Sequence, residues 1–127
     1  MRTSSLLLIG SALALTVNAG AAMADTTAGE AVFKKCRVCH SNIEGKKKVG
    51  PSLYGVVGRT PGTLAGYKYS ASMIDFGKTG AVWDAKTLGT YLIKPRALVT
   101  KTKMMFPGLK KEADRTAVIE YLDSLDN

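Results

Sequence analysis

The strongest chemical signal in this sequence is the run Cys36-Arg37-Val38-Cys39-His40, which places two thiols three residues apart and an imidazole directly after them. This C-x-x-C-H pattern is the attachment signature of c-type haem. Residues i and i+3 lie on one helix face, about one turn apart, so that each thiol can add to one haem vinyl group. His40 follows in position to bind the iron. The spacing therefore predicts one haem c, covalently attached through Cys36 and Cys39.

Three other uses of these residues are weaker alternatives. A thioredoxin-like redox pair needs a βαβ pattern around C-x-x-C, and the sequence shows none. A structural zinc site would need a carboxylate as fourth ligand, which is uncommon, because the chain has only two Cys and one His. A disulfide between Cys36 and Cys39 is an alternative in an exported protein, but it gives no role to His40.

The second axial ligand decides what such a haem does. An open iron site permits gas binding or peroxide chemistry, whereas closed Met/His coordination favours electron transfer at a raised potential. His40 is the only histidine, which excludes two histidine ligands from one chain. Met73 is expected to fill core space. Met104 and Met105 lie in a segment predicted to be extended, where side chains alternate, so only one should face the iron, and spacing does not decide which.

Residues 1–24 are predicted to be a cleaved secretory signal peptide. Arg2 gives a positive start, Leu6–Val17 is mostly apolar, and an Ala-Met-Ala triplet supplies a cleavage site after Ala24. The apolar run is too short to span a bilayer, so no stable membrane anchoring is expected. The leader also lacks the arginine-rich, amphipathic character of a mitochondrial transit peptide. We therefore expect a periplasmic protein in which residues 25–127 form a single domain.

Composition limits the partners of this chain. The 127 residues carry 18 Lys+Arg against 10 Asp+Glu, a net charge of +8, with 13 lysines and 5 arginines. Nucleic-acid binders usually show an arginine-rich stripe or a known motif; neither occurs here, so no nucleic acid is expected. Scattered lysines fit either a solvated surface or steering toward acidic partner proteins, and composition does not separate the two. The apolar content predicts a thin core that needs an additional staple.

The two ends of the predicted domain read as helices. A capping box at Thr27 and Glu30 opens a helix expected at about 28–40. Helical i, i+3, i+4, i+7 spacing predicts the C-terminal helix through the apolar residues Val118, Tyr121, Leu122 and Leu125.

Between these ends the chain reads as short helices and long loops. Segment 45–69 is rich in Gly and Pro and is expected to be a loop with tight turns. Ser70 is expected to cap a short helix ending at Gly77, and Asp84 a helix that runs to about Ile93, where Pro95 forces the stop. Segment 96–107 is expected to be extended. No alternating run suggests a sheet, so the predicted fold class is all-α.

In their order along the chain, these features resemble the class I c-type cytochromes, the family of mitochondrial cytochrome c and of bacterial periplasmic cytochromes of the c-two type. The resemblance covers residues 25–127 and implies the small cytochrome c fold, with three main helices, short helices and long loops around one covalent haem. Besides C-x-x-C-H, it rests on Gly50-Pro51-Ser52-Leu53-Tyr54-Gly55, Gly58-Arg59, Gly66-Tyr67-Lys68-Tyr69, Trp83, Tyr91-Leu92, Pro95, Thr102-Lys103-Met104, Phe106, Gly108 and Tyr121-Leu122.

The resemblance also implies a set of binding residues. It makes Met104, and not Met105, the second iron ligand opposite His40. Pro51 resembles the proline whose carbonyl holds the imidazole N–H. Further implied contacts are Arg59, Tyr69 and Trp83 at the haem propionates, Tyr91 and Thr102 beside the methionine, Phe106 at the haem edge, and Gly29 with Tyr121 where the terminal helices cross.

The function implied by the resemblance is that of a monomeric, soluble one-electron carrier with no catalytic residue, not an enzyme. Such a carrier shuttles electrons between respiratory or photosynthetic membrane complexes and periplasmic redox enzymes. A quinol-oxidising complex is the implied donor; a terminal oxidase, a photosynthetic reaction centre or another reductase is the implied acceptor. Lysines near the haem edge are expected to speed transient docking onto acidic redox partners. A haem enzyme acting on peroxide is a second class, although the sequence offers no distal histidine.

Overall fold

The computed structural model describes residues 25–127, which contain helices joined by long loops and, within this range, no strand. The predicted signal peptide lies outside the described residues. The all-α prediction is confirmed. The elements are α1 (Thr27–Phe33), α2 (Ala71–Lys78), α3 (Ala85–Ile93), α4 (Pro95–Leu98) and α5 (Glu112–Asp123).

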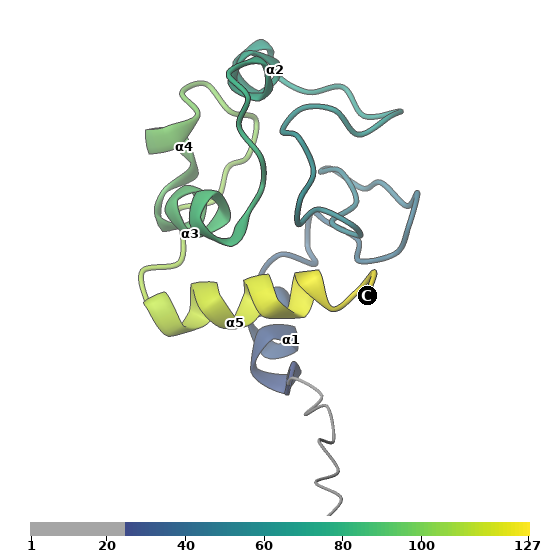
Figure 1. Ribbon diagram of the computed structural model, residues 1–127, viewed down its shortest axis with the longest axis vertical. Helices are drawn as coiled ribbons and strands as arrows, with labels where there is room; N and C mark the ends of the chain where they lie inside the picture. Colours follow the sequence, from purple (N-terminus) through teal and green to yellow (C-terminus); the bar gives the residue numbers. More distant parts are fainter. Residues whose placement is uncertain (1–24) are drawn as a thin grey trace, which may run out of the picture.

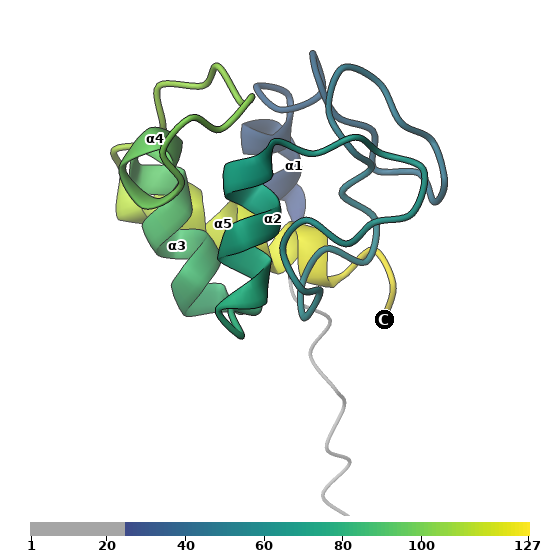
Figure 2. The ribbon, with the colours of Figure 1, turned by 90° about the horizontal axis from the view of Figure 1, so that it is seen from above.

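The helices surround the middle of the molecule on three sides. The helices α1 and α5 cross on one side and α2 lies on the opposite side (Figure 1). Helices α3 and α4 form one flank, and the long loop between α1 and α2 forms the other (Figure 2). Helix α5 contacts both α1 and α3, and α3 contacts α4. Helix α5 therefore joins the N-terminal part of the fold to the α3–α4 flank.

The crossing of α1 and α5 depends on a glycine. A Cβ at Gly29 would lie 2.1 Å from the carbonyl oxygen of Ala117 and 2.5 Å from Cβ of Tyr121, so any side chain would push the helices apart. The fully buried Phe33 follows on the same helix, with its ring centroid 5.3 Å from that of Tyr121. The predicted crossing of Gly29 and Tyr121 is confirmed.

The start and end of α1 differ from the prediction. Thr27 is the first helical residue and makes no side-chain cap; instead its backbone N–H donates to Oδ1 of Asp25 at 3.0 Å. The predicted capping box is therefore wrong, because an Asx-type bond from Asp25 takes the donor that the box would use. The helix also ends at Phe33 and not at residue 40. Beyond it i→i−3 and i→i−4 bonds are mixed, since the N–H groups of Cys36 and Arg37 both donate to Phe33 O, at 2.8 and 2.9 Å. C-x-x-C-H therefore lies in consecutive turns.

The predicted caps of the next two helices are confirmed. The Ser70 hydroxyl accepts from the N–H of Met73 at 3.1 Å and starts α2, and the Asp84 carboxylate accepts from the N–H of Thr87 at 2.7 Å and starts α3. Each side chain satisfies an N–H that the first turn of a helix leaves without a partner.

The segment after α3 is only partly extended. Pro95 occupies the first position of α4, where its fixed φ suits a helix and its missing N–H costs nothing. It therefore ends one helix and begins the next. The prediction of an extended chain from residue 96 is wrong up to Thr102, because a turn closed by the bond from Thr102 N–H to Val99 O at 3.2 Å follows α4. Helix α5 is confirmed, with Val118, Tyr121 and Leu122 buried, whereas Leu125 lies beyond its end.

The core is thin and carries an aromatic centre. The Trp83 ring lies 4.8 Å from that of Tyr91 on α3 and 5.7 Å from that of Phe76 on α2. Met73 is buried on α2, as predicted for a core methionine. The remaining buried apolar side chains are Phe33, Val56, Leu88, Leu92, Val99, Leu109, Val118, Ile119, Tyr121 and Leu122.

Candidate functional site

The imidazole of His40 is buried and held from one side. Its Nδ1 lies 2.7 Å from the carbonyl oxygen of Pro51, and only 8% of the residue is exposed. The tautomer that donates from Nδ1 to this carbonyl leaves Nε2 with a free lone pair, as a metal-binding imidazole requires. Burial lowers the pKa of His40, the bond to Pro51 opposes this, and the charge of Lys48 adds to the lowering. The ring is therefore favoured in its neutral, ligating form.

Gly50 gives the ring its room, and the sequence analysis missed it as a site residue. A Cβ at Gly50 would lie 2.5 Å from Cε1 of His40. The backbone fixes this close approach, because Gly50 N–H donates to Cys39 O at 2.8 Å and Leu53 N–H donates to Ser41 O at 2.8 Å. The available signal was the glycine directly before Pro51 in the quoted motif.

Both cysteines lie in the turns after α1, with Cys36 half-buried and Cys39 exposed. The N–H groups of Cys39 and His40 both donate to the carbonyl of Cys36, at 3.0 and 2.9 Å. The second half of the motif thus closes a turn on the Cys36 carbonyl, although it lies outside α1.

The alternatives to haem find no support in the described part of the chain. Within residues 25–127, no three His, Cys, Asp or Glu side chains gather closely enough to hold a metal ion. The same residues contain no strand, so the βαβ surroundings of a thioredoxin-like pair are missing there.

Met104 and Met105 point in opposite directions, as the alternation predicted. The Tyr91 hydroxyl donates to Sδ of Met104 at 3.4 Å and also lies 3.4 Å from Oγ1 of Thr102. That same Oγ1 accepts from the N–H of Met104 at 3.3 Å. Met104 is half-buried by these contacts, whereas Met105 is 79% exposed. The structure therefore turns one sulfur inward and holds it there.

Burial also acts on the hydroxyl that holds this sulfur. It raises the pKa of Tyr91, with the Thr102 hydrogen bond as an opposing influence. The phenol is therefore kept protonated, which is the form able to donate a hydrogen bond to sulfur.

Arg59 and Trp83 are paired through the backbone. Trp83 N–H donates to Arg59 O, and Gly58 N–H donates to Trp83 O, both at 2.9 Å. The Arg59 guanidinium donates to Ser52 O at 3.2 Å and to Tyr54 O.

Tyr69 and Phe106 are the two remaining predicted haem contacts, and both are half-buried. The Tyr69 ring stands edge-on to Tyr67 at 4.8 Å. Burial raises the pKa of Tyr69, and the charge of Arg59 opposes the rise, so Tyr69 lies within electrostatic reach of that guanidinium.

Three side-chain bonds join the segments that carry these residues. Nζ of Lys47 donates to Gly66 O at 3.0 Å, and the Tyr67 hydroxyl donates to Val49 O at 3.0 Å. Nζ of Lys103 then donates to Lys68 O at 2.8 Å. The segment beside Pro51 is thus tied to segment 66–69, which is tied to the segment that carries Met104.

The predicted residues also share a position at the edge of the core. Cys36, Tyr69, Met104 and Phe106 all pack against the buried cluster while part of each side chain stays uncovered. An apolar macrocycle laid against such a margin would bury them further. Together with a free imidazole lone pair and a soft thioether, which iron of a c-type haem accepts as ligands, these residues fit a covalent haem.

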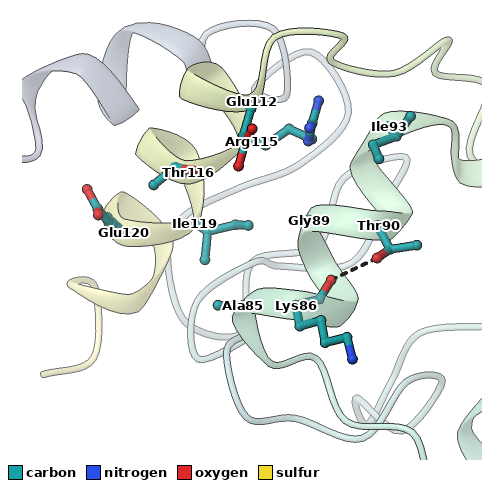
Figure 3. A pocket seen from close by; sticks show the side chains of 10 residues that line it. All are labelled: Ala85, Lys86, Gly89, Thr90, Ile93, Glu112, Arg115, Thr116, Ile119 and Glu120. Atoms are coloured by element: carbon teal, nitrogen blue, oxygen red, sulfur yellow. Dashed lines mark hydrogen bonds between the residues drawn. The ribbon is translucent and has the colours of Figure 1, made fainter.

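An open groove on the described surface lies away from these residues. It has a volume of about 400 Å³ and is lined by residues of α3 and α5, none of which belongs to the predicted haem site (Figure 3). The Thr90 hydroxyl on its wall donates to Lys86 O at 3.0 Å, and Nη1 of Arg115 donates to the carbonyls of Leu109 and Lys110. The Thr90 hydroxyl and the Arg115 guanidinium are thus engaged within the protein.

A haem-attachment motif in a small helical fold without strands in residues 25–127, with a fixed imidazole and an inward thioether, defines a c-type cytochrome. The family model described as Cytochrome c matches residues 26–126, and the chain belongs to this family. Membership implies one covalently bound haem c, for which Cys36 and Cys39 are the two cysteines of the chain.

The relatives and solved structures agree with this assignment. The chain is 47% identical to the cytochrome c2 of Afifella marina over 100 residues, 78% of this chain and 81% of the relative. It is 42% identical to the cytochrome c2 of Rhodomicrobium vannielii over 123 residues, 96% and 95% of the two chains. The structure of cytochrome c2 from Rhodospirillum centenum superposes with a TM-score of 0.75 at 36% identity, over 82% of this chain and 100% of the other.

The predicted family and cytochrome c fold are thereby confirmed. Like its cytochrome c2 relatives, the protein is a monohaem electron carrier and not an enzyme. The alternative of a peroxide-consuming enzyme is set aside. No helix within residues 25–127 has both the length and the apolar character needed to cross a membrane.

Proposed function

We propose that this protein is a periplasmic one-electron carrier whose haem iron is held between His40 and Met104. The observation that supports this most directly is the hydrogen bond from the Tyr91 hydroxyl to Sδ of Met104. It orients one of two adjacent sulfurs inward, on a segment tied by Lys103 to segment 66–69. The bound haem would supply the change between Fe(II) and Fe(III).

On the histidine side, the protein's task is to keep one nitrogen available. Pro51 fixes the proton on Nδ1, and Gly50 leaves the ring unobstructed. A ring held in this way also gains basicity at Nε2 through its hydrogen bond. The same groups hold the ring still, so little rearrangement accompanies a change of oxidation state.

On the methionine side, Tyr91 and Thr102 orient the sulfur and exclude water. A hydrogen bond donated to a thioether withdraws electron density from it, which favours the ferrous state and raises the potential. Thr102 contributes by bonding both Tyr91 and the N–H of Met104. Phe106 is proposed to cover the haem edge on the same side.

We assign Arg59, Tyr69 and Trp83 to the propionate side of the haem. The Arg59 guanidinium would neutralise carboxylate charge, and the phenol and indole would donate hydrogen bonds. Part of the donor capacity of Arg59 already serves Ser52 and Tyr54, which fixes the guanidinium and leaves its charge to compensate a propionate.

Export and cleavage after Ala24 complete the proposal. Residues 1–24 read as a signal peptide, and the match to the Rhodomicrobium vannielii relative extends over 123 residues and so reaches into this segment. Residues 25–127 are the proposed mature domain. A quinol-oxidising complex is the proposed donor, and a terminal oxidase, photosynthetic reaction centre or other reductase the proposed acceptor.

The proposal is tested by the visible spectrum of the protein purified from the periplasm, first oxidised and then reduced with ascorbate. Sharp c-type bands, ready reduction and the weak red band of an iron–methionine sulfur bond are expected. Haem bands without the red band would contradict the Met104 ligand. Protein found only with residues 1–24 attached would contradict the proposed export.

A further inference from the structure

We propose that Met105 is a site of reversible oxidation by hydrogen peroxide, whose sulfoxide product is held by the guanidinium of Arg96. The proposal concerns a side chain that the electron-carrier function does not use. It rests on the exposure of the Met105 sulfur, on its contact with Arg96, and on the contrast with the other methionines of residues 25–127.

The first observation is the difference in access between the methionines. Met105 is 79% exposed, Met73 is buried on α2, and Met104 is half-buried. Oxidation of sulfur by peroxide requires access to the lone pairs. Of these sulfurs, that of Met105 is therefore the one that a peroxide in solution reaches first.

The second observation is a charged donor already placed at this sulfur. Nη2 of Arg96, on α4, lies 2.7 Å from Sδ of Met105. A thioether is a weak hydrogen-bond acceptor, whereas a sulfoxide is polar and presents an oxygen to the same guanidinium. The donor is charged in both cases, so the change lies in the acceptor, which becomes the stronger one. Oxidation should therefore tighten the link between α4 and the segment that carries Met104.

The chemistry balances with one named oxidant. The Met105 sulfur donates an electron pair to one peroxide oxygen as an S–O bond forms and the O–O bond breaks. The sulfur is oxidised by two electrons, the peroxide is reduced, and water leaves with the remaining oxygen and both protons. Methionine sulfoxide reductases reverse such a product.

The test treats the holoprotein with a small excess of hydrogen peroxide and maps the added oxygen by mass spectrometry. Trypsin cuts after Lys103 and Lys110, so Met104 and Met105 share one peptide, and its fragment ions assign the oxygen to either sulfur. We expect oxidation of Met105 well before Met104 and Met73. Equal or earlier oxidation of either, or an unmodified Met105, would overturn the proposal.

The role of Arg96 is tested by the effect of oxidation on the guanidinium chloride midpoint. In the unsubstituted protein oxidation should shift the midpoint upward, and in Arg96→Gln it should not. Lys94→Gln, which removes a neighbouring charge without touching Met105, should behave as the parent. Met105→Leu should show no shift after the same treatment. A shift of equal size in the parent and in Arg96→Gln would overturn the role of Arg96.

Discussion

Nδ1 of His40 lies 2.7 Å from the carbonyl oxygen of Pro51, eleven residues further along the chain. The bond is possible because Gly50, the residue before Pro51, has no side chain to collide with the imidazole ring. At Gly50, a Cβ would stand 2.5 Å from Cε1 of the ring. The hydrogen bond that holds the neutral His40 imidazole therefore depends on the absence of a side chain at Gly50.

The first prediction follows from that contact. Gly50→Ala should displace the ring and lower the free energy of unfolding by about 1–3 kcal/mol, the range for overpacking a well-filled site. Gly89→Ala is the matched control, because nothing lies within 4 Å of a Cβ there and the residue is inside α3. The control should gain up to about 1 kcal/mol from helix propensity. Guanidinium chloride unfolding of both holoproteins measures this, and equal effects would refute the steric argument.

The second prediction separates the two adjacent sulfurs. Met104→Ala should abolish the red iron–sulfur band and lower the reduction potential by on the order of 0.1 V, well inside the ≈ 0.8 V range that axial ligands span. Met105→Ala should keep both, because its side chain points to solvent. Visible spectra and a redox titration decide. If the two variants behaved in the opposite way, the assignment of the ligand would be wrong.

The third prediction concerns the hydroxyl at the sulfur. Tyr91→Phe removes a donor from Met104, which should make the sulfur a better electron donor and lower the potential. A shift on the order of tens of millivolts corresponds to a hydrogen bond of about 1 kcal/mol. Tyr67→Phe serves as control, since that hydroxyl donates to Val49 O and not to sulfur. An unchanged potential in Tyr91→Phe would remove the proposed tuning role of Tyr91.

A fourth prediction concerns the turn before Thr102. Lys101 is the one non-glycine residue of 25–127 with a positive φ, at 60°, a conformation that costs roughly 1 kcal/mol or more for a residue with a Cβ. Lys101→Gly should raise the free energy of unfolding by about 0.5–1 kcal/mol, since relief of strain exceeds the added entropy of the unfolded chain. Lys101→Ala keeps the Cβ and should give no such gain. Denaturant unfolding compares the two; a gain in Lys101→Ala alone would contradict the argument.

The fifth prediction tests whether lysines near the cysteine motif and near Met104 steer the protein toward acidic redox partners. Reduction by an acidic redox partner should slow as ionic strength rises, because the Debye length falls from about 30 Å at 0.01 M to about 8 Å at 0.15 M. Lys35→Gln, beside Cys36, should lower the association rate at low salt. Lys86→Gln, on the wall of the α3–α5 groove, should have a smaller effect. Stopped-flow rates that ignore salt would rule out steering.

Helix caps and side-chain orientations could be predicted from the sequence where residues close along the chain determine them. Ser70 and Asp84 could be predicted as caps because their hydrogen bonds reach only three residues ahead. The opposite orientation of Met104 and Met105 followed from the alternation of an extended chain. The family and the haem followed from C-x-x-C-H and from the order of the segments after it.

What the sequence could not supply are contacts made through space. The end of α1 at Phe33 depends on how the turns of the cysteine motif fold back onto Gly50. The need for glycine at position 50 appears only once the His40 ring is in place. The bond from Lys103 to Lys68 joins residues 35 positions apart, and no local pattern announces it.

The packing of Gly29 against Ala117 and Tyr121 has a consequence for the order in which the fold forms. The partner of the first helix is the last helix, so the loop that this contact closes spans nearly the whole domain. Contacts of such separation form slowly, because the entropy of closing a long loop is lost before the contact is gained. A chain that lacks α5 leaves Phe33 without its aromatic neighbour. The domain therefore completes its fold only when the segment that forms α5 is present.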